Sequence, residues 1–215
     1  MKRPGVTTFL LLLLAAVPAM VALLRLYQIP TGTLPTESLH FAPHPVSHFL
    51  HAMTGASFAL IAPLQLHPGL RRRFPTLHRR LGWVLVAGGT TIAISGLVML
   101  VLYPAAATLP LKATRLVVGS AVLACLYLSI EAVRHRDISG HRIWMLRTYA
   151  LIMGAGTQAV VILLIVLLYG QPSPAAMDVI VALCWPFNLA VAELVIRGYR
   201  LPRWNGSAST APNRS

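Results

Sequence analysis

The segment RRRFPTLHRRLGWVLVAGGTTIAISGLVMLVLY, residues 71–103, decides the fold because it joins a strongly basic stretch to a long apolar one. A bilayer core about 30 Å thick needs roughly 20 apolar residues in a helix. The part from Leu81 to Tyr103 meets this requirement and contains no charged side chain. The segment therefore predicts a membrane-spanning helix that begins next to a cationic loop.

Five further stretches of the chain have the same apolar character and a similar length. None shows the period-2 alternation of a membrane β-barrel strand, and a helix satisfies its backbone groups within the segment. The sequence thus predicts an all-α, polytopic transmembrane helix bundle of about six spans. The five other spans are Thr8–Tyr27, Val46–Leu66, Lys112–Val133, Arg147–Tyr169 and Met177–Ile196.

The composition of the 215-residue chain agrees with this fold class. Hydrophobic residues make up 56% and charged residues 11%, and the mean hydropathy is +0.70. Ordinary soluble domains contain about 25% charged residues. These values exclude soluble, disordered and disulfide-scaffold proteins.

The net charge of +13 comes from 18 Lys and Arg against 5 Asp and Glu. All basic residues but Arg25, Lys112 and Arg115 fall in the termini or in the loops after the second and fourth spans. Lys and Arg gather on the cytoplasmic side of membrane proteins. We therefore expect a multi-pass protein of the bacterial inner membrane with both termini in the cytoplasm. Topology accounts for the charge, so the expected partners are membrane lipids and not nucleic acid.

These spans divide the chain into four predicted regions. Residues 1–27 form a first transmembrane helix, read as a signal-anchor, with a cleaved signal peptide as the alternative. Residues 28–45 form an extracytoplasmic loop, and residues 46–197 form a five-helix membrane domain. Residues 198–215 are expected to be a disordered cytoplasmic tail, since they are rich in Ser, Asn, Pro and Ala.

Two of the basic loops share the pattern R-x-R-x-x-x-x-H-R, at residues 71–79 and again at 134–142. This spacing predicts a parallel two-helix repeat, in which spans two and three form one hairpin and spans four and five another. The alternative is a chance match between two loops that both require positive charge. A true repeat would bring His78-Arg79 and His141-Arg142 to the same depth.

These repeated pairs are the first candidate site. Two neutral imidazoles between helices can ligate haem b, with Arg79 and Arg142 on its propionates. His51 is a third candidate ligand, because an ionisable side chain within a span is costly and suggests function. The alternative is that His and Arg lie at the headgroup level and bind lipid phosphate.

A second candidate is a metal site on the opposite side of the membrane. His40, His44, His48 and His51 are spaced by four, four and three residues, which suits one face of a helix. His44, His48 and His51 are the expected ligands of copper or zinc. The alternative is a set of loop histidines with His51 hydrogen-bonded inside the bundle.

Polar residues at mid-bilayer form a third candidate. Gln158 and Asn188 lie near the middle of the fifth and sixth spans, and Pro186 interrupts the helix beside Asn188. Convergent amides at a kink could hold a small solute or a quinone. The alternative is ordinary hydrogen bonding between helices. Nearer the basic loops, Glu131 and Glu193 are spaced for ion pairs with Arg134 and Arg197.

Several motifs lie between His48 and Arg197: His51 with Gly55 and Ala59, Ala62-Pro63-Leu64-Gln65, Arg71–Arg73, His78-Arg79 with Gly82, GHRIWMLRTYAL at 140–151, and CWPFNL at 184–189 followed by Ala192-Glu193. In these motifs the stretch resembles a family of uncharacterised bacterial multi-pass membrane proteins, a domain of unknown function. The resemblance implies a polytopic membrane protein and no particular activity. Ala62 departs mildly from the family pattern, which has Gly before Pro-Leu-Gln.

The sequence therefore indicates an integral membrane protein of uncharacterised activity. Our leading hypothesis is a haem-binding or quinone-linked redox role that uses His51, His78 and His141. A small-solute or lipid transporter that uses Gln158 and Asn188 is the first alternative. A structural or assembly component of the membrane, in which the histidines do not converge, is the second.

Overall fold

The computed structural model of the protein describes residues 4–104 and 107–200, and every regular element in these ranges is a helix. This confirms the all-α prediction. In chain order the elements are α1 (Pro4–Thr31), the 3₁₀ helix η1 (Thr36–Phe41), α2 (Pro45–Gln65), α3 (Pro68–Arg73), α4 (Pro75–Leu102), α5 (Leu109–Arg134), α6 (Ile138–Ile152), α7 (Gly154–Tyr169) and α8 (Pro174–Arg200).

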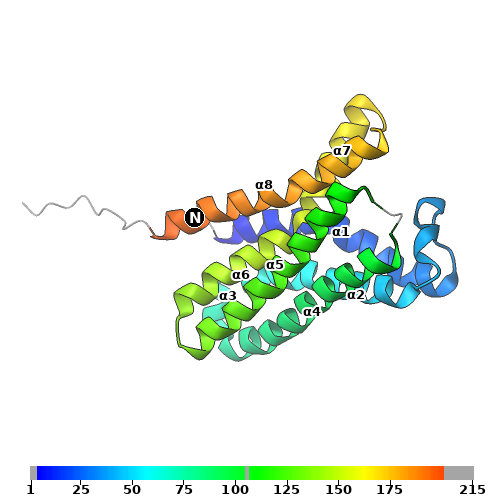
Figure 1. The fold of residues 1–215 in the computed structure, drawn as a ribbon. Coiled ribbons are helices and arrows are strands. Elements are labelled where there is room, and N and C mark those ends of the chain that lie inside the picture. The colour runs from blue at the N-terminus through cyan, green and yellow to red at the C-terminus, as the bar shows by residue number, and fades with distance from the viewer. Residues whose placement is uncertain (1–3, 105–106, 201–215) are drawn as a thin grey trace, which may run out of the picture.

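The long helices lie side by side and alternate in direction (Figure 1). The start of α1, α3, the α5–α6 turn and the end of α8 share one end of the bundle. We call it the basic end, because it carries Arg71–Arg73, Arg79, Arg80, Arg134, Arg136 and Arg142. The opposite end, which we call the η1 end, carries η1, the start of α2 and the end of α4.

Among the described residues, five helical segments are long and apolar enough to cross a membrane, and they match five of the six predicted spans. The remaining prediction, Val46–Leu66, forms α2, which carries His48 and His51 and is not among the five. It nevertheless packs beside both α1 and α4 and extends through the bundle. The five segments are Gly5–Thr31, Pro75–Leu102, Leu109–Arg134, Ile138–Tyr169 and Pro174–Gly198.

The predicted span Arg147–Tyr169 begins too late and is not one helix. The apolar segment runs from Ile138 to Tyr169 and is interrupted at Met153, between α6 and α7. Its charged start misled the sequence prediction, since hydropathy assigned Arg142 to a loop whereas it lies within α6.

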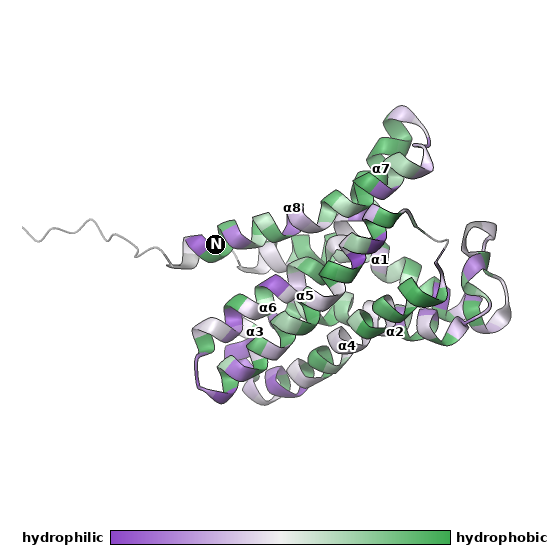
Figure 2. Ribbon diagram, in the orientation of Figure 1, coloured by the Kyte–Doolittle hydropathy of each residue, from purple (hydrophilic) through white to green (hydrophobic). Residues whose placement is uncertain are grey.

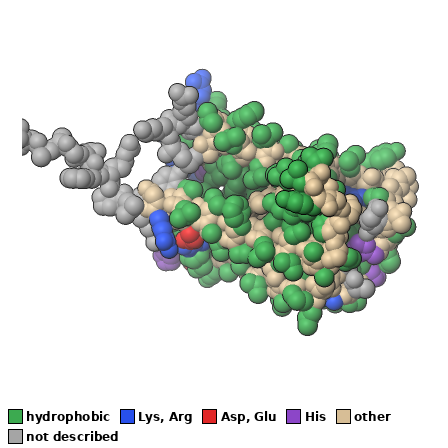
Figure 3. Space-filling model, turned by 90° about the horizontal axis from the view of Figure 1, so that it is seen from above, with side chains coloured by type: hydrophobic (Ala, Val, Ile, Leu, Met, Phe, Trp, Pro, Cys, Tyr) green, Lys and Arg blue, Asp and Glu red, His purple; other side chains and the backbone are tan. Residues whose placement is uncertain are grey.

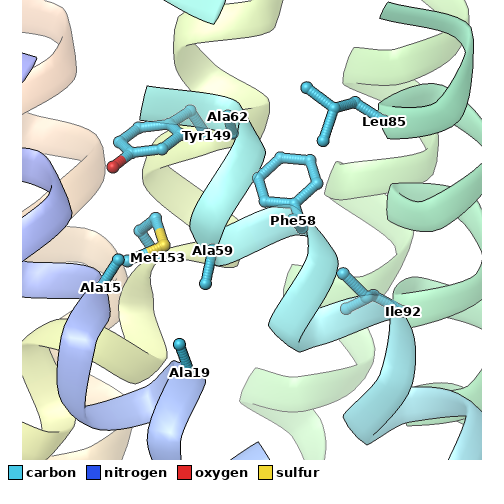
Figure 4. Close-up of a cluster of buried hydrophobic side chains, with 9 residues drawn as sticks. All are labelled: Ala15, Ala19, Phe58, Ala59, Ala62, Leu85, Ile92, Tyr149 and Met153. Atoms are coloured by element: carbon cyan, nitrogen blue, oxygen red, sulfur yellow. The ribbon is translucent and has the colours of Figure 1, made fainter. Parts of the chain in front are cut away.

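The first helix is an integral part of the bundle. Ala15 and Ala19 of α1 are buried in a core cluster with Phe58 of α2 and with Tyr149 and Met153 (Figure 4). Small side chains on α1 allow this close approach between helices. The choice between a signal-anchor and a cleaved signal peptide stays a prediction.

Glycines mark two further close approaches. A Cβ atom on Gly154 would clash with the Trp185 ring, and one on Gly156 would lie 2.9 Å from the carbonyl oxygen of Leu14. Glycine is therefore required where α7 passes α8 and α1. Gly89 of α4 also lies close to its neighbours, since a Cβ atom there would be 3.2 Å from the Leu126 side chain.

The two predicted hairpins point the same way, with both connections at the basic end (Figure 1). The connections themselves differ. The first contains α3, and the second is a tight turn in which Arg136 adopts a positive φ of 60°. The repeat remains a prediction from the sequence.

Hydrophobic residues cover the middle of the helices, and hydrophilic residues gather at α3 and the α5–α6 turn (Figure 2). On the face seen in Figure 3, hydrophobic side chains dominate the centre and the Lys, Arg and His side chains lie toward the ends. Leu167 of α7 and Leu194 of α8 are 75% and 67% exposed, as expected of apolar helices that contact lipid. α8 extends to Arg200, and the rest of the predicted tail lies outside the described residues.

Candidate functional site

At the basic end, the start of α6 is fixed by Asp137. Its carboxylate accepts hydrogen bonds from the backbone N–H of Gly140 (2.8 Å) and from the hydroxyl of Ser139 (2.7 Å). These two bonds lower the pKa of Asp137 below its usual value, because they stabilise the charged form. An aspartate N-cap of this kind places His141 in the first turns of α6.

His141 is held by the neighbouring helix α5. Its Nδ1 lies 2.8 Å from Oγ of Ser129 and 3.2 Å from the carbonyl oxygen of Ser129. A carbonyl oxygen can only accept, so the proton of the ring lies on Nδ1 and the lone pair on Nε2. Ser129 is fully buried. Metal-binding histidines are commonly oriented through the other ring nitrogen in this way.

His78 lies in the first turns of α4, which begins with Pro75 at a favourable N-terminal position. It is half-buried and close enough to His141 for their charges to interact. Both residues lie in the first turns of helices that begin at the basic end, and the equal depth expected from the repeat stays a prediction. Arg79 and Arg142 are exposed at the same end.

A small cavity of about 10 Å³ lies beside His78, between α2 and the α3–α4 connection. Its lining includes Gln65, Arg71 and Phe74. The side-chain oxygen of Gln65 is buried without a hydrogen-bond partner from the protein. The space accommodates about one water molecule.

His51 is held in the same manner as His141, but near the η1 end. Its Nδ1 lies 3.1 Å from the carbonyl oxygen of Ile92 and 3.1 Å from Oγ of Ser95, both on α4. Here too the carbonyl places the proton on Nδ1. His51 therefore does not converge with His78 and His141, and the three candidate haem ligands do not form one site.

The other histidines of the η1 end form an aromatic cluster. The ring of Phe41 lies 3.9 Å from that of His40, 4.3 Å from that of His48 and 4.9 Å from that of Tyr103, between centroids. The hydroxyl of Tyr103 donates to the carbonyl oxygen of His44 (2.6 Å). This cluster packs η1 onto α2 and α4.

Within residues 4–104 and 107–200, no three His, Cys, Asp or Glu side chains come together as a group able to hold a metal ion. In this part of the chain the expected ligands His44, His48 and His51 therefore do not form such a group. Nδ1 of His48 is buried and has no hydrogen-bond partner in the protein. Nothing in the structure assigns that atom a ligand.

The two midplane amides make hydrogen bonds between helices. Asn188 accepts from the hydroxyl of Thr157 (2.7 Å) and donates to the carbonyl oxygen of Ala150 (3.2 Å). Ala150 lies just before the interruption at Met153, so Asn188 supplies a hydrogen-bond donor to a backbone carbonyl next to the break between α6 and α7. Gln158 donates to the carbonyl oxygen of Val181 (3.3 Å). These contacts match the packing interpretation of the amides.

An ion pair within the helices was not predicted. The guanidinium of Arg147 on α6 donates hydrogen bonds to both carboxylate oxygens of Glu193 on α8, from Nε (2.5 Å) and from Nη2 (3.1 Å). The same guanidinium lies 4.5 Å from the ring centroid of Trp144. The sequence pointed to Arg197 as the partner of Glu193, because only residues on one helix have a readable spacing. The predicted pair Glu131–Arg134 is confirmed at 2.8 Å.

The fold and these buried polar contacts define a polytopic α-helical membrane protein. The chain belongs to the family described as "Predicted membrane protein (DUF2306)", whose model matches residues 48–196. No curated protein and no solved structure matches the chain. The family resemblance expected from the sequence is therefore confirmed, and the chemistry has to be argued from the residues.

Proposed function

We propose that this membrane protein binds haem b at the basic end, with His78 and His141 as the residues that would hold the iron. The observation that carries the proposal is the anchoring of His141 by Ser129. It fixes the proton on Nδ1 and leaves the Nε2 lone pair for a metal. His78 supplies a second imidazole from α4, and two-histidine ligation between helices supports electron transfer.

The surrounding charges suit the haem propionates. Arg79 and Arg142 follow the two histidines directly and are exposed at the bundle end. A guanidinium binds a carboxylate through two parallel hydrogen bonds. The cavity beside His78 is far smaller than a porphyrin. Haem binding therefore requires the ends of α4 and α6 to separate, and the α3 and α5–α6 connections are where such movement is expected.

The orientation belongs to the same proposal. We infer that the protein lies in a bacterial inner membrane with the basic end in the cytoplasm, since cationic loops stay on that side. Cysteines introduced at Thr76 and at Gln171 test this placement with a membrane-impermeant thiol reagent. Labelling of intact spheroplasts only at position 171 supports the orientation, and labelling only at position 76 contradicts it.

The haem proposal is tested by absorbance spectroscopy of protein purified from haem-supplied cells. We expect a Soret band and reduced-minus-oxidised bands of a low-spin haem, lost in His78→Ala and His141→Ala. His135→Ala is the matched control, because His135 lies in the α5–α6 connection at the same end of the bundle and its side chain is 80% exposed. A spectrum without a Soret band, or one unchanged in both variants, contradicts the proposal.

Ser129→Ala tests the positioning role of the buried serine. Loss of the hydroxyl leaves only the carbonyl contact to Nδ1 of His141. We expect haem to bind with lower occupancy and with a shifted reduction potential, since such outer contacts tune ligand basicity. An unchanged potential and occupancy would show that Ser129 serves packing alone.

A further inference from the structure

A groove of about 570 Å³ lies between α2 and α4 near the η1 end, away from the proposed haem site. Its walls include Val46 and Leu50 of α2 and Ile94 and Val98 of α4, which are 69%, 37%, 49% and 41% exposed. The groove therefore opens on the outer, apolar surface of the bundle. Its size lies within the usual range of small-molecule sites, and an occupant has to enter from the bilayer.

The length of the groove along α4 is close to the thickness of one leaflet. On α4 it is lined from Leu102, at the helix end, to Thr91. At 1.5 Å per residue this is about 16 Å, close to half of a hydrocarbon core about 30 Å thick. The dimensions fit an amphiphile that is soluble in the bilayer.

Polar atoms at the deep end narrow the choice of amphiphile. The hydroxyls of Thr91 and Ser95 donate to the carbonyl oxygens of Ala87 (3.0 Å) and Thr91 (2.6 Å). The oxygen of Thr91 is therefore left to accept hydrogen bonds, and Ser95 Oγ, which already accepts from Nδ1 of His51 (3.1 Å), keeps one lone pair. An acyl chain offers no donor at this depth. A ring that carries O–H groups does.

We propose that this groove binds an isoprenoid quinol, with the ring at Ser95 and the apolar tail along Ile94 and Val98. Ser95 Oγ also lies 3.1 Å from Nδ1 of His51, so a ring hydroxyl on Ser95 is one hydrogen bond away from that imidazole. Because the hydroxyls act as acceptors, the groove favours the reduced ring over the oxidised quinone, which has no O–H. The proposal does not depend on haem at His78 and His141.

The test is anaerobic titration of the purified protein with decyl-ubiquinol and, separately, with decyl-ubiquinone, followed by isothermal calorimetry. Val98→Trp fills the groove, and Val101→Trp is the matched control, since Val101 lies on the same helix, is 79% exposed and does not line the groove. We expect at least tenfold weaker quinol binding in Val98→Trp and wild-type binding in Val101→Trp. Leu50→Trp, from the opposite wall, repeats the test if Val98→Trp fails to fold.

The polar part of the proposal has its own readout. Ser95→Ala removes one acceptor, and the preference for quinol over quinone is expected to fall. Equal binding in Val98→Trp and wild type overturns the proposal, as does tighter binding of quinone than of quinol. Displacement of the quinol by dimyristoyl-phosphatidylcholine at equal concentration also overturns it and identifies an acyl-chain groove. The Soret band is measured on the same samples, so failure of the haem proposal is recognised separately.

Discussion

The two ends of the bundle hold a histidine in the same way and surround it differently. His141 is anchored to Ser129 at the basic end, and His51 is anchored to Ser95 near the η1 end. In both cases a buried serine and a backbone carbonyl of the neighbouring helix fix Nδ1. Yet His141 has a second histidine, His78, nearby, whereas His51 adjoins a groove that opens on the lipid-facing surface. Orientation of an imidazole is therefore not enough to define its chemistry, which its neighbours decide.

The largest stability effect is expected from the ion pair in the basic half. Arg147→Ala leaves Glu193 without this partner, and the side chains of the pair are only 22% and 34% exposed. Removal of one partner of a buried pair costs about 3–5 kcal/mol, and we expect about 2 kcal/mol after allowing for partial exposure.

The measurement is thermal unfolding in detergent, with a thiol-reactive dye that reports exposure of the buried Cys125 and Cys184. The double variant Arg147→Leu with Glu193→Leu should recover part of the loss, because no charge remains unpaired. A double variant less stable than either single variant would contradict this account of the pair.

The two serine anchors sharpen the comparison directly. Ser129→Ala and Ser95→Ala each remove a hydroxyl from a buried hydrogen-bond network, and each is expected to destabilise the protein by about 1–2 kcal/mol. The same dye assay measures both. Similar losses support equivalent anchors, and a loss confined to one variant would break the parallel between the two ends.

A smaller effect is expected at the η1 end. Tyr103→Phe removes the hydrogen bonds to the carbonyl oxygens of His44 (2.6 Å) and Phe41 (3.2 Å) but retains the ring. We expect a loss of about 1 kcal/mol and faster amide exchange within η1. Hydrogen exchange of Thr36–Phe41 is the measurement, and the exchange of α6 serves as the internal control. Unchanged protection of η1 would show that the aromatic contacts alone hold it.

The smallest effect is expected from the exposed cap of α6. Because the hydrogen bonds lower the pKa of Asp137 in the folded protein, its contribution is complete above the ordinary aspartate pKa and is lost as the pH falls toward the lowered value. Asp137→Asn should therefore lower the unfolding temperature slightly at pH 7, and the difference should vanish in acid. A difference in unfolding temperature between the wild type and Asp137→Asn that grows at low pH would contradict this role of the carboxylate.

The sequence was sufficient for the parts of the fold that depend on local composition. Hydropathy located five spans and the basic end, because lipid requires long apolar helices and the loops concentrate arginine. Hydropathy did not show the break at Met153. The carbonyl oxygen of Ala150 beside the break accepts a hydrogen bond from Asn188, and that residue lies on another helix. The pairing of Arg147 with Glu193, 46 positions away, has no local signal either.

For the candidate site at the basic end, the sequence pointed to the histidines and arginines but not to the serine that contacts His141. The R-x-R-x-x-x-x-H-R pattern predicted that His78 and His141 lie at the same side of the membrane, and in the fold both lie at the basic end. The anchors Ser129 and Ser95 carry no sequence signal, because serines also serve as ordinary interhelical contacts. His51 lies near the η1 end, beside Ile92 and Ser95 of α4, and no spacing in the sequence indicates these neighbours.

Haem content of two single variants tests the central claim most directly. His141→Ala and His51→Ala remove equally anchored imidazoles from opposite ends of the bundle, and the pyridine haemochrome assay gives the haem bound per chain. The account predicts that His141→Ala contains no haem and that His51→Ala retains the wild-type amount. Haem lost in His51→Ala and retained in His141→Ala would contradict it.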